Sequence, residues 1–422
     1  MYKELFTKAK DNNLENFQIL EISTEELDIK IFNDQIDKFE TSDITKYIVS
    51  ANYNNKDVRI VTEKIDNNII DLIKEQAEYI DIDTPVRKIT LEDIKENKTF
   101  KINDPSKIIE RMLNLITLKK QYKNLKEINS YYTESITKRT IITSKNKLYD
   151  IKKEISFSSE ITVSENEKNS TSYKTRIITD DSDINIEKLT KETINNAIDK
   201  LHYKEITNGT YKVILTSEVM GSILRHFINL FSADSIQKDT SLLVDKLGKK
   251  VFSDKITIVE DPNNSKLLGK RLFDNTGKKT SYKEIVKNGI FTKALYDSKT
   301  AKIDKVEVTG NDYGEISVRN MYIKPGNKSL DELIKSIDKG ILVDFVGGLH
   351  AGINPINGNI SIQSEGYYIE NGQKKYATKL FILVTNIMEL LNNVIDISNN
   401  IEFYYQDTAS PDLLLDSIKI SK

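Results

Sequence analysis

Along the first eighty residues, apolar and polar positions alternate in short runs that favour antiparallel strands. The alternation has a period of two, which places every second side chain on the same face of a sheet. Two stretches, Tyr2–Asn12 and Ile69–Tyr79, show instead the spacing of an amphipathic helix. The predicted strands cover residues 17–24, 27–32, 36–40, 47–52 and 58–62. We therefore expect residues 1–84 to form an N-terminal α+β domain.

A polar stretch around Pro85 and residues 92–98 interrupts this pattern and predicts a linker. Beyond it, Ser106 is a suitable N-cap for a helix over residues 107–125. Four strands and a second helix follow, at residues 128–135, 138–143, 147–157, 159–165 and 185–201. Residues 105–205 are thus expected to form a central α+β region.

The pattern changes again near residue 206, where short apolar runs are separated by turn residues. An apolar strand at Tyr211–Leu215 leads directly into a helix over Ser217–Phe231. Asn followed by Gly, a strong signal for a tight hairpin, occurs at residues 288–289, 357–358 and 371–372, and Asn-Thr-Gly occurs at 275–277. Further helices are expected at residues 329–339 and 387–394. The predicted fold class is α+β, with N-terminal and central α/β units that carry antiparallel sheets, followed by a β-rich C-terminal domain over residues 206–422.

Composition narrows the possible functions. The 422 residues include 62 Lys and Arg and 64 Asp and Glu, so the net charge of −2 argues against nucleic acid or an anionic membrane as a partner. There is no Cys, which excludes disulfides, thiol nucleophiles and cysteine-ligated metals. The first ten residues are charged throughout, and the longest apolar runs, such as Leu380–Val384, are short for a membrane span. We expect a soluble, cytoplasmic protein.

The segment Thr210–Phe231 is the most informative place for chemistry. Ser217 stands where the predicted strand meets the predicted helix, a position suited to an N-cap. The helix then carries a polar stripe formed by Glu218, Ser222, Arg225 and Asn229. The simplest interpretation is structural, with Glu218 favoured in the first turn by the helix dipole and Arg225 solvated or in an ion pair.

Other interpretations of these residues have less support in the sequence. Neither Ser217 nor Ser222 lies in the Gly-x-Ser-x-Gly turn of a serine hydrolase. A metal site built from Glu218, His226 and His350 would need two histidines from unrelated segments to meet. The Gly-rich stretch over residues 347–358 lacks the Lys-Ser/Thr of a phosphate-binding loop and indicates a turn instead.

Several blocks of sequence, taken in order, resemble those of one known family. They are residues 29–40, 261–277, 349–372 and 386–403, together with the strand and helix at 210–231. In this order they resemble the TldD/PmbA family of peptidases and peptide-maturation proteins over nearly the whole chain. The TldD branch carries His-Glu-x-x-x-His on this helix and a Cys near its C-terminus, which together bind a metal. Here the aligned run is Ser217-Glu218-Val219-Met220-Gly221-Ser222, so Ser stands at both His positions, and Cys is absent. The chain therefore resembles the PmbA/TldE branch, which lacks the metal ligands.

The resemblance implies a non-catalytic subunit without metal or other cofactor, in which Ser217, Glu218 and Ser222 are a degenerate motif. The implied partner is a metal-bearing TldD-type peptidase, or a second copy in a homodimer, and the substrate is a small or unfolded peptide. The resemblance also places the Gly-rich stretch at a peptide-binding cleft, with His350, Asn354, Gly348, Gly352 and Gly358 as candidate contacts. Two alternatives stay open. One is a self-standing hydrolase around Glu218, Arg225, His226 and His350, and the other is a peptide-binding regulatory protein without hydrolytic activity.

Overall fold

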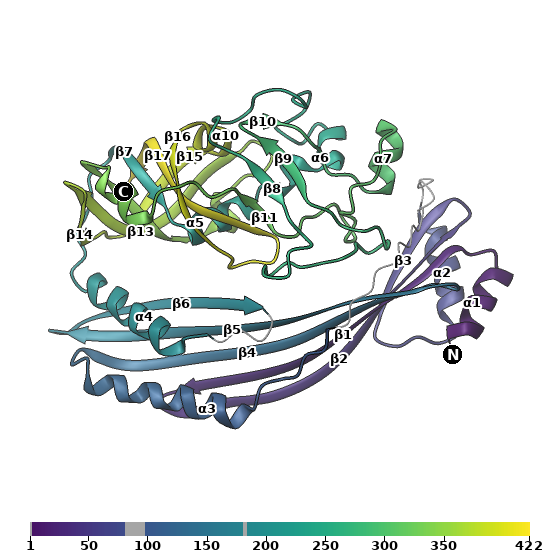
Figure 1. The fold of residues 1–422 in the computed structure, drawn as a ribbon, viewed down its shortest axis with the longest axis horizontal. Coiled ribbons are helices and arrows are strands. Elements are labelled where there is room, and N and C mark those ends of the chain that lie inside the picture. Colours follow the sequence, from purple (N-terminus) through teal and green to yellow (C-terminus); the bar gives the residue numbers. More distant parts are fainter. Residues whose placement is uncertain (1, 81–97, 180–183) are drawn as a thin grey trace.

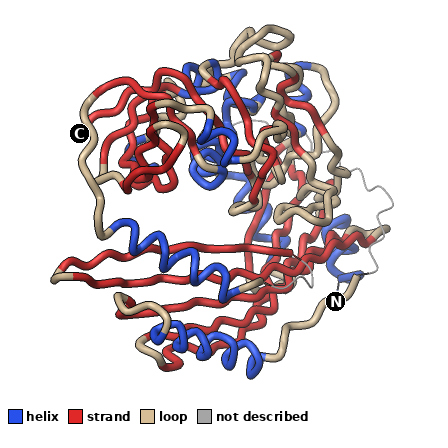
Figure 2. The backbone as a smooth tube through the Cα atoms, turned by 60° about the vertical axis from the view of Figure 1, so that its left-hand side comes forward, coloured by secondary structure: helices blue, strands red, loops and turns tan. Residues whose placement is uncertain are grey.

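The computed structural model describes residues 2–80, 98–179 and 184–422. They form a long antiparallel sheet of six strands and, above it in Figure 1, a C-terminal domain built on an 11-stranded sheet. Figure 2 shows the same two layers from a second direction. The predicted α+β class, with antiparallel sheets and a β-rich C-terminal region that carries a few helices, is confirmed.

The six-stranded sheet is built from long strands joined by tight turns. Its order is β3-β2-β1-β4-β5-β6. The turns at residues 33–34, 54–55 and 166–167 all have positive φ, which suits two-residue hairpins and which Asn and Asp tolerate well. The strands are β1 (Glu15–Phe32), β2 (Gln35–Tyr53), β3 (Lys56–Thr62), β4 (Leu125–Ile142), β5 (Lys147–Glu165) and β6 (Lys168–Thr179).

These strands are longer than the sequence predicts, and β6 is not predicted at all. The ladder between β1 and β2 continues from Thr24, opposite Ile44, to Leu27, opposite Thr41, without interruption. The two predicted strands at 17–24 and 27–32 are therefore one strand. The polar residues between them do not break the ladder, because a strand with one exposed face accommodates them.

Helices cover two parts of this sheet. One hydrophobic core joins α1 and α2 to β1, β2 and β3, and another joins α3, η1 and α4 to β1, β4 and β5. The helices are α1 (Tyr2–Asp11), α2 (Ile69–Glu78), α3 (Pro105–Asn114), the 3-10 helix η1 (Leu115–Lys120) and α4 (Ile186–Lys200). Because β1 pairs with β4 from Ile19 to Ile31, strands from residues 1–84 and 105–205 share one sheet. Their division into separate domains stays a prediction.

Two helix starts differ from the sequence prediction. Asp104, not Ser106, caps α3, because its carboxylate accepts the backbone N–H of Ser106 at 3.0 Å and Pro105 occupies the first helical position. Thr216, not Ser217, is the N-cap residue of α5 (Ser217–Arg225). The predicted helix over 217–231 is also divided, since its last turn is the 3-10 helix η2 (Ile228–Phe231). The predicted linker around Pro85 lies outside the described residues.

The C-terminal domain is built around β7, which is buried over its last three residues and runs parallel to β12 and antiparallel to β17. Val213 and Leu215 of β7 share a core with Val219 and Ile223 of α5. The strands are β7 (Gly209–Leu215), β8 (Ile258–Glu260), β9 (Lys283–Lys287), β10 (Ile290–Phe291), β11 (Met321–Ile323), β12 (Lys339–Gly347), β13 (Asn359–Glu370), β14 (Gln373–Ala377), β15 (Phe381–Asn386), β16 (Val394–Glu402) and β17 (Thr408–Ser421). The remaining helices are α6 (Ala233–Gln237), α7 (Ser298–Asp304), α8 (Leu330–Lys335), α9 (Leu349–Gly352) and α10 (Ile387–Asn392).

The Asn-Gly signals are confirmed at two of these hairpins. Asn288-Gly289 joins β9 to β10, and Asn371-Gly372 joins β13 to β14. Of the helices in the described part of the chain, none combines the length and the apolar character that a membrane crossing requires.

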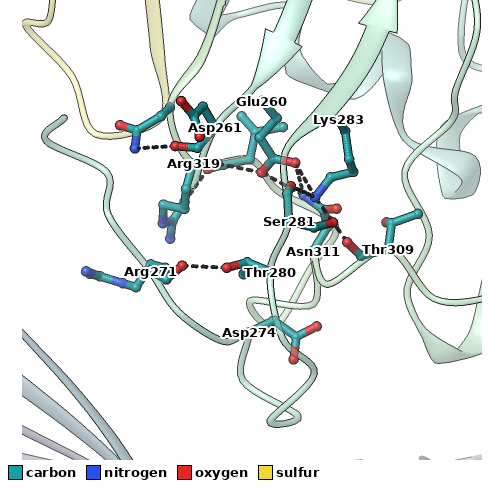
Figure 3. Close-up of polar contacts among 12 residues, drawn as sticks. Glu260, Asp261, Arg271, Asp274, Thr280, Ser281, Lys283, Thr309, Asn311 and Arg319 are labelled. Atoms are coloured by element: carbon teal, nitrogen blue, oxygen red, sulfur yellow. Dashed lines mark hydrogen bonds and ion pairs between the residues drawn. The ribbon is translucent and has the colours of Figure 1, made fainter. Parts of the chain in front are cut away.

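A buried ion pair joins β8 to β9 in the C-terminal domain (Figure 3). Glu260 of β8 and Lys283 of β9 are almost fully buried and lie 2.9 Å apart. The side-chain amide of Asn311 donates to both oxygens of Glu260, and Lys283 donates to the carbonyl oxygen of Thr309. Buried charges stabilise a fold only when their remaining hydrogen bonds are satisfied, and here they are. The loop over residues 309–320 is therefore held firmly against β8 and β9.

A second set of buried contacts joins this region to the long sheet. Phe273 packs on Leu20 and Ile141, away from the helix-covered cores. Beside it, Arg139 of β4 donates to the side-chain oxygen of Asn275 at 2.6 Å and lies 3.6 Å from Asp150. Arg139 and Asp150 are each 4% exposed. These contacts set how the C-terminal domain sits on the sheet.

The change Arg139→Met should destabilise the protein by about 3 kcal/mol, because it leaves Asp150 buried without its cation. The matched change Arg225→Met removes an ion pair to Asp407 in which the arginine is 52% exposed, and it should cost less than about 1 kcal/mol. Urea unfolding of the two variants checks this difference. Equal losses in both would show that Arg139 does not hold the two layers together.

Candidate functional site

A cleft with a volume of ≈ 510 Å³ lies between the outer edge of the long sheet and the C-terminal domain. One wall comes from β5, β6 and α4, and includes Tyr173 and Lys174 of β6. The other wall comes from the junction of β7 with α5, from β12, β13 and the start of α8, and from β16, β17 and the chain that joins them. β6 is the last strand in the order of the sheet, so its outer edge faces this region (Figure 1).

Ser217 and Glu218, the first two positions of the predicted degenerate motif, both line the cleft. The Ser217 hydroxyl donates to the carbonyl oxygen of Ser410 and accepts the backbone N–H of Glu402 at 3.1 Å. The backbone N–H of Ser217 donates to the carboxylate of Asp412 at 2.8 Å. This serine therefore fastens the start of α5 to β16 and β17. A hydroxyl held in this way has no base positioned to activate it as a nucleophile.

Ser222 lies further along α5, and His226 follows the last residue of this helix. Ser222 is buried, and its hydroxyl donates to the carbonyl oxygen of Val219 at 2.8 Å. His226 is partly buried, and its Nδ1 lies 2.9 Å from the carbonyl oxygen of Ser222. Neither side chain belongs to the lining of the cleft. The structure therefore separates Ser222 from Ser217 and Glu218.

Glu218 points into the cleft with its charge only partly compensated. Its side chain is accessible to solvent, yet protein atoms surround it on several sides. This desolvation raises the pKa of Glu218 to about 7, further raised by Asp344 and Glu402 and opposed by Lys174 and Arg176. A carboxyl with such a pKa can exchange a proton near neutral pH.

Asp344, which sequence reasoning missed, lies in the same cleft because of a local irregularity of β12. Val343 pairs with Gly366 and Phe345 pairs with Glu365, so Asp344 is an extra residue without an opposite partner. Such a β-bulge turns a side chain away from its regular direction and is frequent beside functional sites. Gly366 makes the bulge possible, since a Cβ there would lie 1.8 Å from the carbonyl oxygen of Leu342. Burial raises the pKa of Asp344.

Two other acids of the cleft are already paired. Glu402 forms an ion pair with Arg176 at 2.5 Å and also accepts the hydroxyl of Tyr404. These contacts lower the pKa of Glu402 against the effect of its burial. Glu365 forms an ion pair with Lys200 of α4 at 2.8 Å. Both pairs connect the long sheet and its helix to the C-terminal domain across the cleft.

The Gly-rich stretch over residues 347–358 lies beyond the end of β12, outside the lining of the cleft. His350 is exposed on the four-residue helix α9, and Asn354 accepts the backbone N–H of Ile356 at 3.0 Å. The backbone favours glycine at all three candidate positions. Gly348 and Gly358 have positive φ, and a Cβ on Gly352 would lie 2.3 Å from the carbonyl oxygen of Ser361. Peptide contacts by these five residues stay a prediction.

The side chains that the structure describes do not form a site for the metal that the TldD branch of the family binds. Over residues 2–80, 98–179 and 184–422, no three His, Cys, Asp or Glu side chains converge as metal ligands would. His202 lies 3.0 Å from Glu165, whereas His226 follows the last residue of α5 and His350 lies on α9. The trio of Glu218, His226 and His350 considered above is therefore not assembled.

Comparison with known proteins finds similarity to proteins named PmbA and TldD. Residues 208–422 match the family model described as the PmbA/TldA metallopeptidase C-terminal domain. A metalloprotease PmbA homolog of Buchnera aphidicola subsp. Acyrthosiphon pisum is 31% identical over 214 residues, 51% of this chain and 47% of that protein. A metalloprotease TldD homolog of the same organism is 29% identical over 290 residues, 64% of this chain and 59% of that protein. The chain spans about half the length of the curated relatives it matches.

Solved structures share the fold over the full length. TldE from Thermococcus kodakarensis has a TM-score of 0.86 at 19% identity, covering 100% of both chains. A putative modulator of a DNA gyrase from Thermotoga maritima has a TM-score of 0.89 at 23% identity, covering 100% of this chain and 99% of that chain. At these identities the likeness shows the fold alone.

The raised pKa of Glu218 predicts a pH-dependent effect of Glu218→Gln. The folded state binds a proton on this side chain more tightly than the unfolded state, whose pKa is the usual 4.5. The stability gained from that proton is full below about pH 4.5 and is lost as the pH rises through about 7. The variant should therefore melt progressively higher than the wild type between pH 5 and pH 8. The change Glu307→Gln, at an exposed position, is the control and should leave the melting temperature unchanged at every pH. If the effect of Glu218→Gln on the melting temperature were also independent of pH, it would contradict the raised pKa of Glu218.

Proposed function

The chain belongs to the PmbA/TldD family, and on that basis we propose that it is a metal-free, non-catalytic subunit of a peptidase complex. In this proposal a metal-bearing TldD-type partner supplies the hydrolytic centre in a hetero-oligomer. This chain, in the cytoplasm, contributes a cleft that holds a small or unfolded peptide.

One observation carries the proposal, namely how Ser217 is used. In the TldD branch this position is expected to hold a metal-binding imidazole, whereas here the hydroxyl is engaged by the backbone at Glu402 and Ser410. Ser222, at the second imidazole position, is likewise bonded to its own helix. Hydroxyls are weak ligands for zinc compared with imidazole or thiolate. Both serines therefore serve the fold, which supports a degenerate metal site.

The edge of β6 supports the peptide-handling role. An exposed strand edge offers unpaired backbone N–H and C=O groups to an extended peptide, which can bind with little sequence preference. Residues 171–174 of β6 line the cleft directly. A peptide added along this edge would lie between the two layers of the molecule.

Glu218 favours one alternative, a self-standing hydrolase. A carboxyl with a pKa of about 7 in a cleft is a candidate general acid or base. Such an enzyme still needs a nucleophile or an activated water, and Ser217 is not free to act as one. The hetero-oligomer therefore remains our proposal.

The proposal predicts activity only in the mixed complex. The purified chain alone should bind less than stoichiometric zinc and should not cleave an unfolded peptide, whereas mixing with a TldD-type protein should generate cleavage that neither shows alone. The control uses a TldD-type protein whose metal-binding histidines are replaced. Zinc bound by this chain alone together with cleavage would support the hydrolase instead. Peptide binding without cleavage in any mixture would support a regulatory protein.

The change Ser217→Ala separates a structural from a catalytic serine. Loss of its hydrogen bonds should lower the free energy of unfolding by about 1–3 kcal/mol. The cleavage rate of the mixed complex, corrected for the folded fraction, should stay within about twofold of the wild type, since a nucleophile would cost several orders of magnitude instead. A collapse of the rate with unchanged stability would show that Ser217 reacts.

A further inference from the structure

The charge of the cleft points to the chemistry of its occupant. Two basic side chains, Lys174 and Lys200, line it. Six acidic side chains line it as well, Glu160, Glu218, Asp344, Glu365, Glu402 and Asp412. We propose that the cleft selects peptides that carry a positively charged nitrogen group, a Lys or Arg side chain or the α-ammonium group. This inference rests on the proposed function only in taking the occupant to be a peptide.

Three of the six acidic side chains form an ion pair or accept the hydroxyl of a tyrosine. Glu402 pairs with Arg176 and Glu365 pairs with Lys200. Glu160 accepts the hydroxyl of Tyr131 at 3.0 Å. These contacts hold the walls of the cleft and leave the charge of Glu218, Asp344 and Asp412 to be explained.

Those three acids have no cation within ion-pair distance among the described residues. Glu218 and Asp344 accept no hydrogen bond from the described chain, and one oxygen of Asp344 is fully buried without a partner. Lys174 opposes the charge of both Glu218 and Asp344. Arg176 also acts on Glu218, and Lys200 also acts on Asp344, but these two cations are paired with Glu402 and Glu365. Lys174 thus opposes the charge of two of the three acids and is not itself paired with either of them in the described part of the chain.

Asp412 gives an independent indication of a missing positive charge. It is only 2% exposed, and its Oδ1 accepts the backbone N–H of Ser217. Its Oδ2 has no hydrogen-bond partner, although the side chain belongs to the lining of the cleft. A buried carboxylate with an unsatisfied oxygen is costly unless a cation lies near it. A positively charged group of a bound peptide would supply that cation from the side of Glu218.

The bulge in β12 shows that the arrangement is built into the backbone. Asp344 would point elsewhere in a regular strand, and the bulge places it between Val343, which pairs with Gly366, and Phe345, which pairs with Glu365. The next residue, Phe345, is 47% exposed and lines the cleft, as does Tyr173, which is 60% exposed. The ammonium group of Lys200 already lies over the Phe345 ring, 5.4 Å from its centroid. The exposed ring of Tyr173 suits a further Lys or Arg side chain, whose stem packs on the ring while its charged end reaches the acids.

Direct binding of peptides to the full-length chain tests the inference without the partner. The probes are unstructured Ser/Ala-rich peptides with a dye at the C-terminus, followed by fluorescence anisotropy. One is N-acetylated and carries a central Lys, a second has norleucine in place of Lys and a free α-ammonium group, and a third has norleucine and an acetylated terminus. At least one of the first two should bind about tenfold tighter than the third. Which one does so identifies the side chain or the terminus as the group recognised.

Two variants that change the charge of the cleft in opposite directions keep the test valid even if one of them fails to fold. The double change Glu218→Gln with Asp344→Asn should reduce the tenfold preference to about twofold, and Lys174→Ala should increase it by about threefold, since it removes the opposing charge. The exposed change Glu307→Gln is the control and should leave the preference unchanged. Should the double variant misfold, Lys174→Ala alone decides the question.

The two proposals fail in different ways. Equal binding of all three peptides would overturn the charge selection and leave peptide handling in place. Absence of binding by every peptide would contradict peptide handling by this chain and the inference with it. An unchanged preference in Lys174→Ala would also overturn the inference, because the selectivity would then arise elsewhere.

Discussion

The cleft exists because Arg139 and Phe273 fix the C-terminal domain onto the middle of the long sheet. Phe273 fills an apolar site on the sheet while Arg139 satisfies the polar groups beside it. The ion pair between Glu260 and Lys283 stiffens the adjoining loops (Figure 3). Both sets of contacts lie away from the cleft and act through the relative position of the two layers. With that position set, β6 and α4 lie opposite β12 and the start of α5.

The chemistry of the cleft follows from charges that this arrangement brings together from distant parts of the chain. Glu218 comes from α5, Asp344 from β12 and Lys174 from β6. Burial desolvates the first two, and no cation of the described residues lies within ion-pair distance of them, so their pKa values rise although Lys174 opposes the shift. A protein retains such a cost when a ligand offsets it or when the groups react. Since Ser217 is committed to the backbone, a ligand is the better account here.

Much of the fold could be predicted from local patterns, because tight turns and helical spacing are local properties. The Asn-Gly turns at 288–289 and 371–372 and the helices α1 and α2 follow from their own residues. The length of β1 could not be predicted, since its partners β2 and β4, not its own polar residues, sustain it. The site was predictable only at Ser217 and Glu218, through the family motif. Asp344 was not, because a bulge depends on the register with Gly366, which no local pattern in β12 reveals.

Hydrogen–deuterium exchange of the full-length chain, with and without a saturating Lys-containing unfolded peptide, tests the account most directly. If the peptide lies in the cleft along the edge of β6, the backbone amides of residues 171–176 and 400–404 should become protected. Residues of α1, at the far end of the long sheet, should not change. Protection confined to residues 348–358, with none at β6, would contradict the cleft as the place where this chain holds a peptide.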